Sequence, residues 1–169
     1  MKKMVKQFSV LIPTSVHIKK FLHKEYGNPI KIDCYTLMGI VIISLLEKQS
    51  FHVAMHEVDK KKKFSNYIVE VVCKAPLSMM KDYGHCMSID KVVQINRFYE
   101  KLFYEKLFLF VQHKLDKNKR KMGVQDAINE YCDIYGIDID TDISYDAMKK
   151  AEYRNRHHLN NIFRATVLS

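Results

Sequence analysis

The sequence predicts an α+β protein that is mainly helical, with a small antiparallel β-ribbon, several packed helices and a closing pair of helices. Two segments of alternating hydrophobicity are each followed by helical periodicity, which favours the mixed class. The 169 residues include only five Gly, three Pro and no Trp, a composition that disfavours a large all-β fold and long disordered linkers. Hydrophobic residues at 47% are enough to build a globular core.

The first predicted element is a strand over residues 4–12. Its side chains alternate between two faces, one apolar and one mostly polar. The inward set is Phe8, Val10 and Ile12, and the outward set is Gln7, Ser9 and Leu11. We therefore expect a half-buried strand with one face open to solvent.

A helix is predicted over residues 16–26. Pro13 removes a ladder donor just before it, and Thr14 or Ser15 can cap its first turn. Gly27 is expected to end the helix because glycine tolerates left-handed geometry.

The next predicted helix covers residues 34–47, with Asp33 as its cap. It is apolar on nearly every face, so we expect it to be buried centrally. A strand is then predicted over residues 66–74, and residues 51–58 can form another. Four consecutive lysines, residues 60–63, separate these two segments.

The spacing Y-G-x4-I-D begins at Tyr26 and recurs at Tyr83. Each copy follows a strand, a proline and a short helix, and precedes a long apolar helix. This predicts a degenerate duplication of a strand–helix–helix module over residues 5–49 and 66–116. The alternative is coincidence, since Tyr-Gly ends many helices and Asp begins many.

A long helix is predicted from about residue 88 to 115, with a broad aromatic face that favours core or oligomer packing over a ligand pocket. The basic stretch at residues 113–123 reads as a connector. We therefore expect one region over residues 1–116 and a basic helical region over 117–169.

The last region predicts a helix over residues 124–136, an acidic turn over 137–142, and a basic helix over 144–164 capped by Asp142 or Ser144. Helix, tight turn and basic second helix make a helix–turn–helix-like pair.

The chain carries a net charge of +9 and has a pI near 9.3. Such a balance favours polyanionic partners: DNA, RNA, anionic lipid or an acidic protein. A lysine-rich proteome explains it equally well, because lysine outnumbers arginine 23 to 5.

Catalytic and cofactor motifs are missing from the sequence: there is no Gly-rich phosphate loop and no setting for an activated nucleophile. His52 and His56 are spaced for a helical metal site but have no third ligand. Asp138, Asp140 and Asp142 alternate as in calcium loops, yet the glycine and glutamate of such loops are absent, which favours turn and capping roles. We expect no enzyme activity, no cofactor and no metal.

The four cysteines form no CxxC pair, which predicts reduced thiols in a cytosol. They are Cys34, Cys73, Cys86 and Cys132. The N-terminal apolar stretch is too short for a signal peptide, and the longest apolar run is about half a membrane span. We expect a soluble cytoplasmic protein with no membrane contact.

Basic and aromatic side chains gather on one side of the final predicted helix. They are Lys149, Lys150, Tyr153, Arg154, Arg156 and His157. Lysine and arginine can neutralise phosphates, and arginine can also contact a guanine edge. We expect this face to bind nucleic acid, the alternative being an ordinary solvated surface.

The segment QFSVLIPTSV, residues 7–16, resembles the ribbon of ribbon–helix–helix repressors of the Arc type, and the resemblance covers residues 5–49. It implies that antiparallel strands enter the DNA major groove and that outward side chains read bases. Gln7 and Ser9 would be such readers. Leu11 stands where the family usually has a polar or basic residue.

Together these features predict a non-enzymatic DNA-binding protein, a regulator or a replication or partition factor of a phage or mobile element. Two alternatives stay open: a structural or assembly protein of such an element, and an RNA-binding accessory subunit of a nucleoprotein enzyme. A homodimer or a larger assembly is compatible with each of these three functions.

Overall fold

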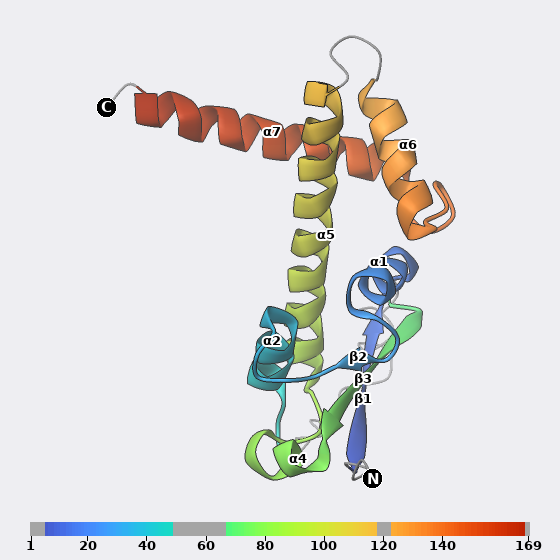
Figure 1. Cartoon of the computed structure of the whole chain (residues 1–169), viewed down its shortest axis with the longest axis vertical. Helices are drawn as coiled ribbons and strands as arrows, with labels where there is room; N and C mark the ends of the chain where they lie inside the picture. Colours follow the sequence, from blue (N-terminus) through green and yellow to red (C-terminus); the bar gives the residue numbers. More distant parts are fainter. Residues whose placement is uncertain (1–5, 49–66, 118–122, 168–169) are drawn as a thin grey trace. The chain divides into compact units, whose positions relative to one another are not determined.

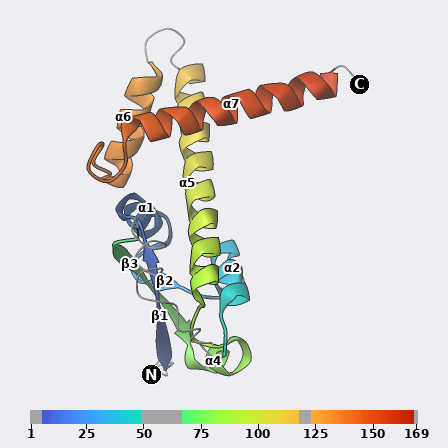
Figure 2. The same ribbon diagram turned by 180° about the vertical axis from the view of Figure 1, so that it is seen from behind.

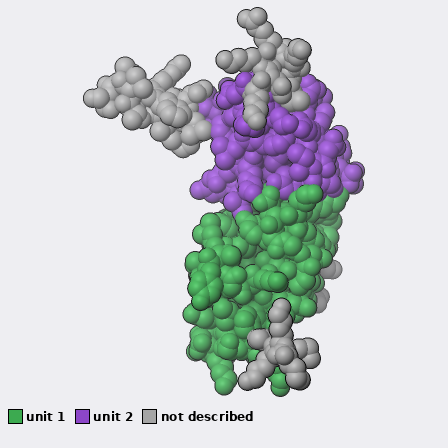
Figure 3. Space-filling model, in the orientation of Figure 1, with its two compact units in different colours: residues 1–99 green, residues 100–169 purple. Residues whose placement is uncertain are grey.

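The computed structural model describes residues 6–48, 67–117 and 123–167, except for the side chains of residues 117 and 158–167. The chain divides into two compact units (Figure 3), residues 1–99 as unit 1 and residues 100–169 as unit 2. The strand considered at residues 51–58, and with it His52 and His56, lies outside the described residues.

The division falls inside the long helix α5 (Ile89–Lys117), between Tyr99 and Glu100. The first part of the predicted basic connector, residues 113–117, belongs to α5, and residues 118–122 lie outside the described residues. The predicted helix over residues 88–115 is confirmed. Each unit therefore contains one end of α5.

Unit 1 contains a three-stranded sheet in the order β1-β3-β2 (Figure 1). Strands β1 (Gln7–Thr14) and β3 (Val69–Pro76) pair antiparallel along their full eight residues. Strand β2 (Ile30–Lys31) pairs parallel with β3 on its other side. The mainly helical α+β class is confirmed, but the sheet is mixed, because β2 adds a parallel strand to the predicted antiparallel ribbon.

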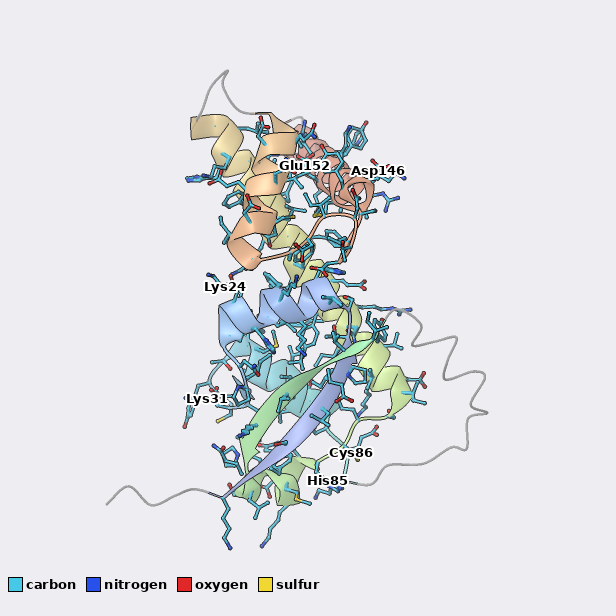
Figure 4. The ribbon with its side chains drawn as sticks, turned by 90° about the vertical axis from the view of Figure 1, so that its right-hand side faces the viewer. Lys24, Lys31, His85, Cys86, Asp146 and Glu152 are labelled. Carbon is cyan, nitrogen blue, oxygen red and sulfur yellow. The ribbon has the colours of Figure 1, made fainter. Side chains whose placement is uncertain are left out.

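One face of this sheet is buried and the other is open. On β1 the buried side chains include Val10 and Ile12, whereas Leu11 between them is 53% exposed. On β3 the side chains of Val71 and Cys73 are buried. Figure 4 views the sheet from its open face, with α2 and α5 behind it. The predicted alternation of β1 is confirmed.

Each long strand is followed by a helix that ends at a glycine. Helix α1 (Val16–Tyr26) ends at Gly27, with φ +85°, and helix α4 (Leu77–Tyr83) ends at Gly84, with φ +101°. Backbone in this region is restricted almost wholly to glycine. The end of α1 is as predicted, while the duplication itself remains a prediction.

Gly84 also permits a close approach of two chain segments. A Cβ there would lie 2.1 Å from the carbonyl oxygen of Glu47, which no side chain tolerates. The backbone N–H of Glu47 donates to the carbonyl oxygen of Cys86 at 2.8 Å. These contacts tie the segment after α2 to the segment before α5.

Helix α2 (Leu37–Leu45) begins later than predicted, because Thr36 rather than Asp33 is its N-cap. The Thr36 hydroxyl accepts a hydrogen bond from the backbone N–H of Gly39 at 3.1 Å. Asp33 Oδ1 instead accepts from the N–H of Tyr35 at 2.9 Å and of Thr36 at 2.8 Å, forming a turn ahead of the helix.

The expectation that α2 lies centrally is wrong. Met38 and Ile42 are buried, but Leu37 is 65% exposed and Ile40 is 50% exposed. Unit 1 covers only one side of this short helix with residues that the structure describes. An amino-acid pattern that is apolar all round therefore leaves an apolar face on the surface.

Strand β1 is held at Pro13 by a side-chain hydrogen bond from α5. Proline has no N–H to offer, and its carbonyl oxygen accepts a hydrogen bond from the side-chain amide of Asn96 at 2.8 Å. Asn96 is buried and also donates to the Val92 carbonyl oxygen at 2.9 Å. A polar residue on α5 thus anchors the strand.

Unit 2 packs the C-terminal part of α5 against α6 (Val124–Tyr135) and α7 (Tyr145–Val167). Tyr131 is at the centre of its core, with its ring 5.7 Å from Phe103 and 5.5 Å from Phe110 in edge-to-face geometry. Met148 of α7 is fully buried.

The turn between α6 and α7 is built as the sequence predicts. Gly136 adopts the left-handed conformation after α6. The Asp142 carboxylate accepts from the backbone N–H of Asp138 at 2.9 Å, and the Ser144 hydroxyl accepts from the N–H of Ala147 at 3.2 Å. The helix pair and the Ser144 cap are confirmed. In the described part of the chain, every helix is too short or too polar to cross a membrane.

Candidate nucleic-acid interface

Helix α7 arranges its described side chains in stripes, because residues four apart lie on the same side of a helix. One stripe, here the outer stripe, consists of Tyr145, Lys149, Tyr153 and His157. The next, here the groove stripe, consists of Asp146, Lys150 and Arg154. Ala147, Ala151 and Asn155 follow beside it.

The outer stripe is ordered by its own contacts. Lys149 Nζ lies 5.9 Å from the centre of the Tyr145 ring, a cation–π distance. The Tyr153 and His157 rings are 6.2 Å apart, and Tyr153 is 63% exposed. The stripe therefore offers aromatic and donor groups to a partner outside the protein.

The groove stripe borders a groove of roughly 540 Å³ between α5 and α7, entirely within unit 2. Lys101, Tyr104 and Glu105 line its α5 side. Its α7 side is lined by Ser144, Asp146, Ala147, Lys150, Ala151, Arg154 and Asn155. Ala147 and Ala151 are small, so the groove is open down to the helix surface.

Two of the groove's three cations have no counter-ion among the residues that the structure describes. Lys150 and Arg154 make no ion pair or hydrogen bond with any residue that the structure describes. Lys101 Nζ lies 3.8 Å from Glu105 Oε1, and both side chains are largely exposed. An exposed pair of this kind contributes little to stability. The groove thus holds cations that an anionic group can reach.

Tyr104 contributes a neutral donor. Burial, and then the nearby Glu100 carboxylate, raise the pKa of its hydroxyl above the ordinary value. The phenol therefore keeps its proton at neutral pH. It can donate a hydrogen bond to an anion in the groove.

Arg156 is held on a different side of α7. Its Nε and Nη2 donate to Glu152 Oε1 at 3.0 and 2.6 Å, and Gln112 Nε2 donates to the same oxygen at 3.0 Å. The Glu152 residue is only 2% exposed; Figure 4 labels it together with Asp146, also on α7. Arg156 is the cation of this buried carboxylate, so we leave it out of the candidate interface.

The other predicted residues, Gln7 and Ser9, lie in unit 1 on the open face of the sheet. Both are exposed. Across the strand pair, Gln7 faces Pro76, and Ser9 faces Lys74. The structure therefore brings Lys149, Lys150, Tyr153, Arg154 and His157 together on α7 and places Gln7 and Ser9 in the other unit.

Sequence reasoning missed Lys101 and Tyr104. The aromatic pattern of their helix indicated packing, and nothing in the local pattern shows which turn of α5 meets α7. Their spacing of three residues places them on one side of a helix, but only the tertiary structure identifies that side as part of a groove.

Comparison of the chain with protein-family models, with curated proteins and with solved structures gives no match. Within the described ranges, no three His, Cys, Asp or Glu side chains are grouped closely enough to hold a metal ion. The chemistry of the interface therefore has to be argued from its own residues.

Proposed function

We propose that this protein is a non-enzymatic DNA-binding protein and that helix α7 is its DNA-contacting element. The observation that carries the proposal is the pair Lys150 and Arg154. They lie one turn apart on an exposed face and have no counter-ion among the described residues. Cations left unpaired by the fold can neutralise phosphates without first breaking an internal contact.

The dimensions of α7 suit duplex DNA. Its 23 residues make a helix about 34 Å long, roughly the length of one turn of B-DNA. Figures 1 and 2 show that its C-terminal half projects beyond α5 and α6. A projecting helix can enter the major groove, which is about 12 Å wide and admits an α-helix.

The groups on α7 match the tasks of such a helix. Lysine and arginine bind phosphates, and exposed tyrosine and histidine can contact base edges or sugar. We propose a regulatory, replication or partition role on DNA of a phage or mobile element. RNA is the second choice of nucleic acid, because structured RNA also binds basic, aromatic surfaces.

A second candidate function, assembly with other proteins, is favoured by a different observation. Tyr35 at 92%, Leu37 and Ile40 form an exposed apolar surface beside and along α2. Exposed apolar patches often mark protein contacts. A chain that associates through this surface should change mass with concentration in light scattering, and Leu37→Ser/Ile40→Ser should abolish that change.

The test of DNA binding is fluorescence anisotropy with labelled duplexes over a salt series. Lys150→Gln/Arg154→Gln should weaken binding about tenfold and reduce the slope of log K against log salt by about 2. The matched control is Lys24→Gln/Lys81→Gln, which removes the same charge from two exposed positions of unit 1. Equal losses in both variants would show attraction to overall charge and would reject α7 as the site.

A further inference from the structure

We infer that the groove between α5 and α7 holds backbone phosphates of the bound nucleic acid through Lys101, Lys150 and Arg154, while the outer stripe of α7 contacts the bases. This inference rests on the proposed function and divides its surface into two parts. It also adds α5 as a second contact element.

The cations of the groove come from both of its walls. Lys150 and Arg154 face the groove from α7, and Lys101 faces it from α5. Side chains four apart on a helix have Cβ atoms about 6 Å apart, so the two α7 cations flank a single phosphate position. Lys101 approaches from the opposite wall. A phosphate lying there meets positive charge on two sides.

The lining of the groove also includes uncharged side chains. Tyr104 and Asn155 provide hydrogen-bond donors, while Ala147 and Ala151 leave room at the floor of the groove. A phosphodiester is a compact anion with several acceptor oxygens, so it suits a shallow polar groove with cations and neutral donors. An unstacked base of a single strand would instead need a flat aromatic or apolar slot.

Glu105 is one of two acidic residues in the groove lining. Its carboxylate pairs with Lys101 at 3.8 Å, so a phosphate in the groove competes with it for the same ammonium. Asp146 adds a second negative charge to the lining. These carboxylates weaken the binding of any anion and would strengthen the binding of a cation. Removal of Glu105 therefore tests the sign of the ligand's charge.

The outer stripe, Tyr145, Lys149, Tyr153 and His157, is assigned to base contacts and the groove to phosphate contacts. None of its four residues lines the groove. Contacts to phosphate position a protein, whereas contacts to bases specify sequence. Groove variants should thus weaken binding to all duplexes, and outer-stripe variants should reduce the preference for a selected site.

The experiment measures anisotropy of the full chain with a selected duplex and with random duplex. Lys101→Gln should weaken binding to both by about threefold and reduce the salt slope by about 1. Glu105→Gln should tighten binding to both by about twofold. Tyr153→Ala/His157→Ala should reduce the ratio between the two duplexes and leave the salt slope unchanged. Lys81→Gln, an exposed position in unit 1, is the single-charge control.

The outcomes separate the inference from the function on which it rests. If Lys150→Gln/Arg154→Gln loses binding but Lys101→Gln equals Lys81→Gln and Glu105→Gln does not tighten, α7 binds DNA and the groove inference is overturned. If the unaltered protein binds no duplex, both fail. Displacement of the duplex by micromolar nucleoside monophosphate would make the groove a free-nucleotide site and would also overturn the inference.

Discussion

The sheet of unit 1 and helix α7 of unit 2 both expose regularly spaced side chains, but they do so for different physical reasons. The sheet face depends on the pairing of β1 with β3, segments far apart in the sequence. At its centre Leu11 lies opposite Val72, and its charges include both Glu70 and Lys74. The α7 face follows from helical periodicity alone, and its cations are not balanced by neighbouring acids to the same extent. Both faces are exposed, so the proposed DNA contact rests on Lys150 and Arg154, which have no counter-ion among the described residues.

Most of the net positive charge lies in unit 1, whereas the candidate interface lies in unit 2. Residues 1–99 contain 16 Lys and Arg against 8 Asp and Glu, whereas residues 100–169 contain 12 against 11. Unit 1 therefore carries most of the net positive charge of the chain. In unit 2 the acids concentrate before α7 and leave Lys149, Lys150 and Arg154 on its surface. The net charge of a unit therefore does not by itself locate the proposed contact surface.

The largest expected effect comes from a substitution that destabilises unit 1 alone and leaves α7 unchanged. Gly84→Ala should lower the free energy of unfolding by about 4 kcal/mol, because it combines backbone strain with overpacking against Glu47. Gly27→Ala is the matched control: it has a similar backbone conformation but open space around the added Cβ, and should cost about 2 kcal/mol.

Urea denaturation measures both glycine variants, and anisotropy follows their DNA binding under native conditions. Equal costs at the two glycines would contradict the close contact between Gly84 and Glu47. Loss of DNA binding in folded Gly84→Ala would contradict the proposed role of α7, because it would show that DNA binding also requires unit 1.

Two arginines of α7, Arg156 and Arg154, are expected to have different roles, the first in stability and the second in DNA binding. Arg156→Ala leaves the buried Glu152 carboxylate without its ion pair, which should cost about 3 kcal/mol. Arg154→Ala, an exposed neighbour of the same type, should change stability by less than about 0.5 kcal/mol and should weaken DNA binding. Thermal and urea unfolding measure the first effect. A stable Arg156→Ala protein with weakened DNA binding would return Arg156 to the interface.

Cysteine labelling compares the two units within one molecule. Burial raises the pKa of the Cys73 thiol in unit 1 to about 12 and, with the nearby Asp133 and Asp142 carboxylates, that of Cys132 in unit 2 to about 11. Because the thiolate is the reactive form, both should react with an aromatic disulfide at pH 8 only on unfolding, whereas exposed Cys34 reacts at once. Mass spectrometry of single-cysteine variants measures the rates. Rapid labelling of Cys73 or Cys132 in the folded protein would contradict the packing described for that unit.

What the sequence predicts correctly is mostly local. The ends of α1 and α6 are signalled by Gly27 and Gly136, and the start of α7 by Ser144. The alternation of β1 follows from the two-residue period of a strand, and the helical period, which is different, places the cations of α7 on neighbouring stripes.

What the sequence does not predict depends on tertiary contacts. The two-residue strand β2 exists only because β3 offers a free edge. Ile40 looks like a core residue until α2 is seen to be covered on one side only. The spacing of Glu152 and Arg156 signals an ion pair, but its burial beneath Gln112 of α5 does not follow from spacing. The position of Lys101 in the groove likewise depends on how α5 packs against α7, which the local sequence does not show.

The most direct test of the central claim compares the two surfaces on one duplex. A site enriched by selection is titrated at several salt concentrations with Gln7→Ala/Ser9→Ala, which alters the sheet face, and with Lys150→Gln/Arg154→Gln, which alters α7. We predict that the sheet variant binds within about twofold of the unaltered protein, because neither side chain carries a charge to neutralise phosphate. The α7 variant should lose about tenfold and show a shallower salt dependence. Loss of site preference in the sheet variant, with binding by the α7 variant unchanged, would contradict the account and make the strand pair the DNA-contacting element.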